Sequence, residues 1–254
     1  MNTEQAIAAF WTCARNRTAP PSEWMNRLSR DDAYRVQLGV LARHVQAGER
    51  QAGWKVGLTS KAMQIQQKVH EPVLGFLLAS GERPGGTRFQ FDDLINPGFE
   101  NELCLTVGRT LRGPGVTTAQ AQAALSAMAP AFEIIEKRGD FAADLNVSLA
   151  DNAQQRAYVT GAAVPVPPGF DLATVSLELR VNGGAPDRAL GGEVLGTPAA
   201  SIAWLANKLA ELGLALEAGM KVMSGSFTRQ YPLNRGDRIE ASFVPLGPVR
   251  ADFV

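Results

Sequence analysis

The sequence has few of the residues on which several kinds of protein chemistry depend. Its 254 residues include only two cysteines, Cys13 and Cys104, and two histidines, and the formal net charge is zero. Two cysteines cannot form a disulfide framework, and they agree with a reducing cytoplasm. With so little sulfur and imidazole, a zinc centre is not expected. A chain without an excess of basic residues also lacks the electrostatic footprint of a nucleic-acid-binding protein.

Long apolar runs are missing as well. No stretch approaches the length that spans a membrane, and the N-terminus lacks the charged-then-apolar order of a signal peptide. We therefore expect a cytoplasmic protein without a membrane partner that acts on a small molecule. The apolar fraction of 45% is enough to bury a core as one large domain or two small ones.

Several catalytic and nucleotide-binding motifs are absent. The chain contains neither G-x-G-x-x-G nor G-x-x-x-x-G-K-[ST], so neither a dinucleotide fold nor a P-loop is indicated. Ser224-Gly225-Ser226 differs from the G-x-S-x-G nucleophile elbow. We expect His44 to lie on a helix with ordinary surface surroundings, so a Ser-His-Asp triad would depend on His70 alone.

The order of the expected elements indicates an α+β fold. Helical patterns dominate the first 80 residues, at 4–15, 29–45 and 61–69, with a short strand over 53–58. Later segments are mostly strands, expected over 87–91, 100–107, 132–136, 175–181, 221–223, 238–243 and 249–254, with helices over 117–128 and 197–212. Because crossover helices are few, the sheet should be mixed and mostly antiparallel. We predict an N-terminal helical portion over 1–80 and a mixed β domain over 81–254, packed as one compact unit.

Two glutamates near the middle of the chain are the most informative feature. In Glu100-Asn101-Glu102, on a strand-like run, the two carboxylates project side by side, and they repel unless solvent or a cation neutralises them. Glu133 lies within another short apolar run. Such a set of carboxylates suits a hard cation such as Mg²⁺ or Mn²⁺. The alternative is that all three acids are solvated on an exposed sheet face.

Ordered motifs spanning roughly residues 30 to 253 resemble one known family. They are Asp32-Ala33-Tyr34-Arg35-Val36-Gln37, Gly53-Trp54-Lys55-Val56-Gly57-Leu58-Thr59-Ser60, Glu100-Asn101-Glu102, Phe132-Glu133-Ile134-Ile135, Ala150-Asp151-Asn152, Gly191-Gly192-Glu193-Val194-Leu195-Gly196, Trp204-Leu205-Ala206-Asn207-Lys208-Leu209 and Met223-Ser224-Gly225-Ser226-Phe227-Thr228. Together they are similar to the hydratase/decarboxylase branch of the fumarylacetoacetate hydrolase superfamily.

The resemblance implies a metal-dependent lyase of aromatic meta-cleavage pathways. Members hydrate 2-hydroxypenta-2,4-dienoate or decarboxylate 2-oxo-3-hexenedioate. The matching positions imply that Glu100, Glu102 and Glu133 hold Mg²⁺ or Mn²⁺ and that Lys55 faces the substrate. The family fold is a mixed β-sheet roll with an N-terminal helical portion. Its members form homo-oligomers, and hydratase and decarboxylase members also associate with one another.

Further motif positions are candidates for binding the substrate. Ser224 and Ser226 could donate hydrogen bonds to a carboxylate, or they could be turn residues beside a glycine. Asp151 and Asn152 match a family loop near the site, where they could instead stabilise the loop itself. Lys55 is either the site lysine that the resemblance implies or a surface ammonium on a strand flanked by glycines.

Three positions depart from the hydratase pattern. Hydratases of this type usually carry an acid where this chain has Val73, in Pro72-Val73-Leu74-Gly75, and decarboxylases tend to have an apolar residue there. Arg156 could hold a second carboxylate bidentately, which would favour a dicarboxylate, or it could be a solvated loop arginine. His70-Glu71 is a pair of the kind that activates water in the hydrolase branch, although a histidine just after a helix is usually incidental.

Hydration of a 2-hydroxy-2,4-dienoate is the preferred function. Decarboxylation of 2-oxo-3-hexenedioate is the closest alternative. A third possibility is a C–C hydrolase of acylpyruvates that uses His70 and Glu71 as catalytic residues. A non-catalytic partner subunit is the fourth, and the retained glutamates and Lys55 speak against it.

Overall fold

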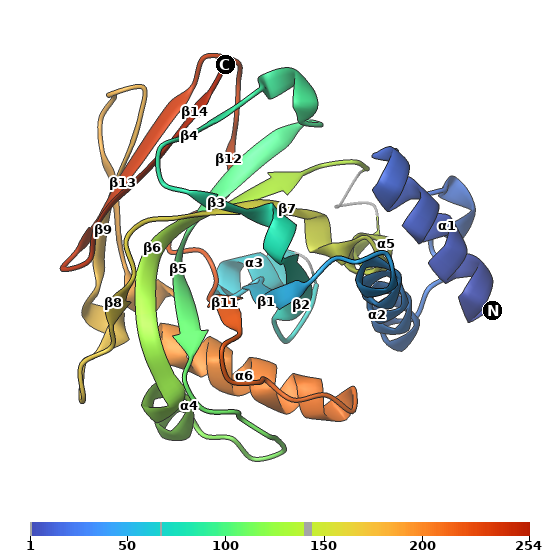
Figure 1. Cartoon of the computed structure of the whole chain (residues 1–254), viewed down its shortest axis with the longest axis horizontal. Helices are drawn as coiled ribbons and strands as arrows, with labels where there is room; N and C mark the ends of the chain where they lie inside the picture. The colour runs from blue at the N-terminus through green and yellow to red at the C-terminus, as the bar shows by residue number, and fades with distance from the viewer. Residues whose placement is uncertain (1, 67, 140–143) are drawn as a thin grey trace.

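The computed structural model describes residues 2–66, 68–139 and 144–254 (Figure 1). The α-helices are α1 (Thr3–Asn16), α2 (Arg30–Gln46), α3 (Lys61–Gln66), α4 (Thr118–Ala124), α5 (Leu145–Ala150) and α6 (Pro198–Glu211). The strands are β1 (Gln51–Gly57), β2 (Val73–Leu78), β3 (Glu82–Pro84), β4 (Thr87–Phe89), β5 (Pro97–Val107), β6 (Leu125–Glu136), β7 (Gln155–Thr160), β8 (Val164–Pro165), β9 (Ser176–Val181), β10 (Asp187–Leu190), β11 (Lys221–Met223), β12 (Tyr231–Pro232), β13 (Arg238–Val244) and β14 (Gly247–Phe253).

Two sheets form the frame of the molecule. The nine-stranded sheet has the order β2-β1-β11-β5-β6-β7-β3, with β12 beside β5 and β8 beside β6. The five-stranded sheet has the order β10-β9-β13-β14-β4. Most neighbours are antiparallel, and the parallel pairs among the described strands are β1 with β11, β3 with β7 and β4 with β14. The predicted α+β fold with a mixed, mostly antiparallel sheet is confirmed.

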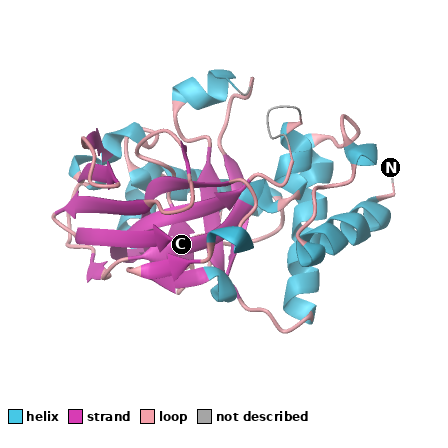
Figure 2. Cartoon of the chain, turned by 90° about the horizontal axis from the view of Figure 1, so that it is seen from above, coloured by secondary structure: helices cyan, strands magenta, loops and turns pink. Residues whose placement is uncertain are grey.

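The helices lie at one side and along one edge of these sheets. Figure 2 shows the helices near the N-terminus gathered beside the strands, and Figure 1 shows α6 and α4 running below them. The α2 helix begins with the expected capping box, in which Ser29 and Asp32 exchange side-chain-to-backbone hydrogen bonds. The α6 helix buries Ile202, Leu205 and Leu209 as its amphipathic pattern predicts, although the Thr197 side chain makes no capping hydrogen bond.

The predicted boundary near residue 80 does not separate helices from strands. The helical portion ends with α2 at Gln46, and β1 and β2 belong to the nine-stranded sheet, where they pair with each other. Both strands are almost entirely buried, because β1 also pairs in parallel with β11 from far along the chain. This long-range pairing leaves no local trace in the sequence. Part of the helix predicted over 61–69 lies outside the described residues, and α3 covers 61–66.

The helix predicted over 117–128 is too long. Its start is correct, since Thr117 and Gln120 form a capping box, but α4 ends at Ala124 and β6 begins at Leu125. The β6 strand pairs along nearly all of β5, from Glu136 opposite Pro97 to Leu125 opposite Val107. Sheet pairing therefore overrides the helical pattern in the last turn. Among the described helices, none has both the length and the apolar character needed to cross a bilayer.

Candidate metal centre

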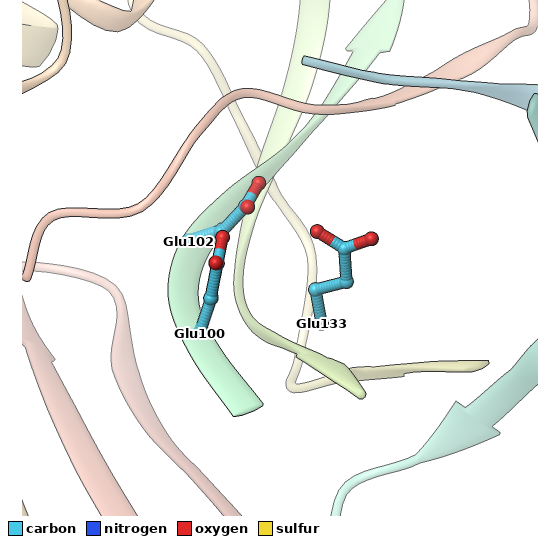
Figure 3. Close-up of side chains that lie close together, drawn as sticks. All are labelled: Glu100, Glu102 and Glu133. Atoms are coloured by element: carbon cyan, nitrogen blue, oxygen red, sulfur yellow. The ribbon is translucent and has the colours of Figure 1, made fainter. Parts of the chain in front are cut away.

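Three glutamate side chains meet on one face of the β5–β6 pair. Glu100 lies directly opposite Glu133 in the antiparallel register, and Glu102 follows two residues later on the same face of β5. One carboxylate oxygen from each residue lies within 4.8 Å of the others (Figure 3). Glu102 and Glu133 are fully buried and Glu100 is half-buried. The alternative of three solvated acids on an exposed face is therefore wrong for Glu102 and Glu133.

The protein alone does not balance the charge of this cluster. Burial, followed by the neighbouring carboxylates, raises the pKa of Glu102. Burial also raises the pKa of Glu133 to about 7, although Lys55 acts in the opposite direction. Lys55 Nζ lies 3.3 Å from Glu133 Oε1. Burial opposes the charge of this lysine, but Glu133, Glu100 and Glu102 outweigh it and raise the Lys55 pKa.

Several buried oxygens of the glutamates, and of the two serines that flank Gly225, have no hydrogen-bond partner among the described residues. They are Glu102 Oε1, Glu133 Oε1 and Oε2, Ser224 Oγ and Ser226 Oγ. Most buried polar atoms in native proteins have a partner, so a group of orphaned oxygens indicates a missing ligand. Carboxylate oxygens are the donors that hard divalent cations prefer, and the three glutamates therefore fit Mg²⁺ or Mn²⁺.

Backbone geometry holds Lys55 against the cluster. Lys55 lies opposite Gly75 of β2 and Met223 of β11. A Cβ on Gly75 would come within 3.2 Å of Lys55 Cε, and one on Gly57 would lie 3.5 Å from Lys55 Nζ. The Lys55 side chain therefore packs against two glycines, where larger residues would crowd it. The alternative of a surface ammonium is wrong, because Lys55 is only 5% exposed. The same Gly57 position is 3.3 Å from the Val73 side chain, which places this departure from the hydratase pattern beside the lysine.

The segment after β11 supports Glu102 through its backbone. The Gly225 N–H donates a 2.8 Å hydrogen bond to Glu102 Oε2. Gly225 has φ +110°, and a Cβ there would lie 2.4 Å from the Thr59 side chain, so only glycine fits. On the other side of the cluster, the Gln230 amide donates to Glu100 Oε1 at 3.2 Å. The sequence reasoning missed Gly225 and Gln230 as supports, since neither a positive φ nor a contact across more than a hundred residues shows as a motif.

Other predicted site residues lie elsewhere. Glu71 is half-buried and forms an ion pair with Lys208 of α6, with 3.2 Å between Glu71 Oε1 and Lys208 Nζ. His70 is exposed. No described contact joins either residue to the three glutamates. His44 is not an ordinary surface residue as expected, because its ring packs edge-on against Trp11 and Phe76.

Asp151, Asn152 and Arg156 line a cavity whose described lining does not include the three glutamates, and Arg156 lies on β7 rather than in a loop. Asn152 stabilises its loop, which is one of the two roles predicted for it. Its Oδ1 accepts a hydrogen bond from the Phe76 N–H at 2.7 Å, and its Nδ2 donates one to the Phe76 carbonyl at 3.0 Å. Asp151 pairs with Arg138, and burial raises the pKa of Asp151 to about 7 although Arg138 opposes the shift. Arg156 approaches Glu136 with 3.5 Å between Nε and Oε1, so it is not a fully solvated loop arginine.

Comparisons with known proteins agree with this geometry. A family model described as fumarylacetoacetate (FAA) hydrolase C-terminal matches residues 42–254. The chain is 34% identical to 2-hydroxyhexa-2,4-dienoate hydratase of Comamonas testosteroni over 92% of this chain and 90% of the relative. It is 36% identical to 4-oxalocrotonate decarboxylase of Pseudomonas sp. strain CF600, over 88% and 85% of the two chains. The solved structure of 4-oxalocrotonate decarboxylase from Pseudomonas putida G7, complexed with magnesium and adipate, superposes with a TM-score of 0.94 at 32% identity, covering 100% of this chain and 99% of that one.

Proposed function

The chain belongs to the fumarylacetoacetate hydrolase family, and from this premise we propose that it is a magnesium- or manganese-dependent lyase. Its proposed reaction is hydration of a 2-hydroxy-2,4-dienoate to a 4-hydroxy-2-oxo acid in aromatic meta-cleavage catabolism. The observation that carries the proposal is the buried cluster of Glu100, Glu102 and Glu133 beside Lys55, with its orphaned oxygens. Relatives over most of the chain are named as 2-hydroxydienoate hydratases.

Glu100, Glu102 and Glu133 would hold the metal. When bound, the cation would supply Lewis acidity to the C1 carboxylate and the C2 oxygen of the substrate. The glutamates present their oxygens from adjacent paired strands, and the Gly225 N–H keeps Glu102 oriented. Ser224 and Ser226 are placed beside this segment with hydroxyls that have no partner among the described residues, and they suit the C1 carboxylate.

Lys55 is the proposed acid–base group. Its Nζ lies 3.3 Å from Glu133 Oε1, at the edge of the proposed metal site, and its burial keeps it away from bulk water. An ammonium at this position can donate to the C2 oxygen as negative charge develops there, and it can shuttle a proton as the dienol ketonises with protonation at C5. Water then adds at C4 to give the 4-hydroxy-2-oxo acid.

Decarboxylation of 2-oxo-3-hexenedioate is the second candidate, and Val73 favours it. The residue beside Lys55 is apolar where hydratases of this type usually carry an acid, and relatives of similar identity are named 4-oxalocrotonate decarboxylases. The position of Arg156, the residue predicted to bind a second substrate carboxylate, favours hydration instead. Arg156 lines the cavity next to Glu136 and makes no described contact with the three glutamates. We therefore keep hydration as the primary proposal.

Incubation of the purified protein with Mg²⁺ and each substrate separates the two reactions. We expect 2-hydroxypenta-2,4-dienoate to give the 4-hydroxy-2-oxo acid, identified by NMR, faster than 2-oxo-3-hexenedioate releases CO₂. A clear preference for the dicarboxylate with CO₂ release would overturn hydration in favour of decarboxylation. If the protein consumes neither substrate in the presence of Mg²⁺ or Mn²⁺, the lyase proposal as a whole is wrong.

Assembly and location complete the proposal. We propose that the protein acts in the cytoplasm as a homo-oligomer and can associate with a sister lyase of the same family. Its two cysteines, Cys13 and Cys104, are buried and unbridged, which agrees with a reducing compartment. Light scattering during gel filtration tests the assembly, and a mass equal to that of one chain would contradict it.

A further inference from the structure

The cavity lined by Asp151, Asn152 and Arg156 lies on the face of the β1–β2 pair toward which Phe76 points. It has a volume of about 230 Å³ and is bounded by the end of α1, by α2, by β2 and by the turn that carries Asp151 and Asn152. Phe76 of β2 lines it and contacts His44 of α2, whereas the adjacent residue Gly75 faces Lys55. Since neighbouring residues of a strand point to opposite faces, Phe76 turns toward the cavity whereas Gly75 turns toward Lys55. The two regions approach each other at Asn152, which lines the cavity and whose Oδ1 would lie 3.0 Å from a Cβ on Gly75.

Charged side chains, most of them partly buried, surround this cavity. Its described lining includes the four arginines Arg15, Arg17, Arg138 and Arg156 and three acids, Glu49, Glu136 and Asp151. Burial lowers the pKa of His44, the remaining titratable group, so it is neutral at physiological pH. Even with Asp151 counted as ionised, the described lining has one positive charge in excess.

The excess is localised at two guanidinium groups. The single carboxylate of Glu136, 4% exposed, accepts from Arg17 at 2.5 Å and lies 3.5 Å from Arg156 Nε. The same oxygen accepts from the backbone N–H of Ile95. Arg17 Nε and Arg156 Nε are both buried without a hydrogen-bond partner among the described residues. Asp151, in contrast, is engaged by Arg138 at 2.5 Å.

We propose that this cavity binds a small organic carboxylate, held by Arg17 and Arg156. Two guanidinium groups that share one carboxylate have unused donors in the planar, forked arrangement that matches a second carboxylate. A ligand anion would cancel the excess charge and satisfy both orphaned Nε groups. The small volume limits the ligand to the size of a short mono- or dicarboxylate. This site is additional to the metal centre and does not depend on the lyase proposal.

Calorimetric titration of adipate into the full-length protein without added metal tests the site. We expect binding by wild-type protein and an affinity at least about tenfold weaker in Arg156→Gln, the scale of a hydrogen bond to a charged group. Arg188→Gln is the matched control, since Arg188 is an exposed arginine that also pairs with a glutamate, Glu178, outside the cavity. Glu102→Gln should bind adipate as wild type does. Thermal unfolding of Arg156→Gln checks that the variant folds, and Arg156→Lys, which keeps the charge but not the fork, should also be weaker.

Four results would overturn the proposal, three with adipate and one with phosphate. The first is no binding at millimolar adipate, and the second is unchanged affinity in Arg156→Gln. The third is loss of binding in Glu102→Gln, which would assign the adipate to the metal centre. Inorganic phosphate serves as the comparison anion, and binding of phosphate as tight as that of adipate would refute the assignment to carboxylates. Failure of this test leaves the activity assay unaffected, because that assay depends on Mg²⁺ and the opposite face of the strands.

Discussion

The two faces of the β1–β2 pair hold buried charge in opposite ways. On the face of Lys55, three carboxylates meet one ammonium, which forms an ion pair with Glu133, and oxygens of Glu102 and Glu133 accept no hydrogen bond from the described residues. On the face of Phe76, the arginines outnumber the acids and the orphaned atoms are guanidinium nitrogens. The sign of the excess indicates the ligand that each face suits, a cation on the first and an anion on the second. The cost of uncompensated charge is greater on the first face, because Glu102 and Glu133 are fully buried whereas Arg17 and Arg156 are partly exposed.

Removing a metal ligand should have the largest effect on this comparison. Glu102→Gln should weaken Mg²⁺ or Mn²⁺ binding by more than the roughly 10–100-fold that outer supporting residues contribute, with activity falling accordingly. The fold should persist, because the substitution removes like-charge repulsion and a costly buried carboxylate. Metal titration and thermal unfolding measure the two effects, and Glu240→Gln, a surface strand residue, is the control. Unchanged metal affinity would show that the cluster is not a metal centre, as would crystals soaked in Mn²⁺ with no anomalous peak between the carboxylates.

Loss of Lys55 should affect turnover more than metal binding. Lys55→Ala should lower turnover by roughly 10²–10⁴-fold, the range for a general acid–base group. The variant should keep its metal, since the three glutamates remain. Steady-state kinetics and metal titration provide the measurement, with Lys137→Ala as an exposed lysine control. Lys55→Met fills more of the space of the lysine side chain, so a loss of turnover in this variant reports on the missing ammonium group rather than on lost packing. Near-normal turnover in both variants would make Lys55 structural.

Gly225→Ala tests whether the backbone supports Glu102. A Cβ at this position would collide with Thr59 and displace the N–H that holds Glu102, so metal affinity should fall by roughly 10–100-fold. Gly219→Ala is the matched control, because Gly219 also has a positive φ of +87° but has open space around its Cβ position. Both variants carry backbone strain, and only Gly225→Ala should lose metal. Equal metal affinity in the two variants would remove Gly225 from the site.

The smallest expected effect is on the pH dependence of stability, through Asp151 on the face of Phe76. Burial raises the pKa of Asp151 to about 7 from its ordinary value of 3.8. Between these values the folded state binds more protons than the unfolded state, so the contribution of Asp151 to stability decreases as the pH rises. The free energy of unfolding of wild type should therefore fall relative to Asp151→Asn between about pH 5 and about pH 8. Urea unfolding at both pH values measures this difference, and parallel profiles would show that Arg138 keeps Asp151 ionised throughout.

Much of the site could be predicted from local sequence. The i, i+2 spacing of Glu100 and Glu102 on a strand-like run places both carboxylates on one face wherever that strand pairs. The capping residues of α2 and α4 mark where those helices begin, because a side chain three residues from a backbone N–H satisfies it locally. The scarcity of histidine and cysteine in the chain leaves oxygen ligands as the main choice for a metal.

Tertiary structure decided everything that depends on register and long-range pairing. The β5–β6 register puts Glu133 opposite Glu100, and the same pairing turns the expected end of α4 into strand. The parallel pairing of β1 with β11 joins segments far apart in the chain, which buries Lys55 beside the glutamates. It is also the folded chain that turns Arg156 toward Glu136, although its sequence neighbours suggested a site beside the substrate. Short-range patterns determine which residues share a face, whereas the neighbour of that face is determined only when distant strands pair and exclude water.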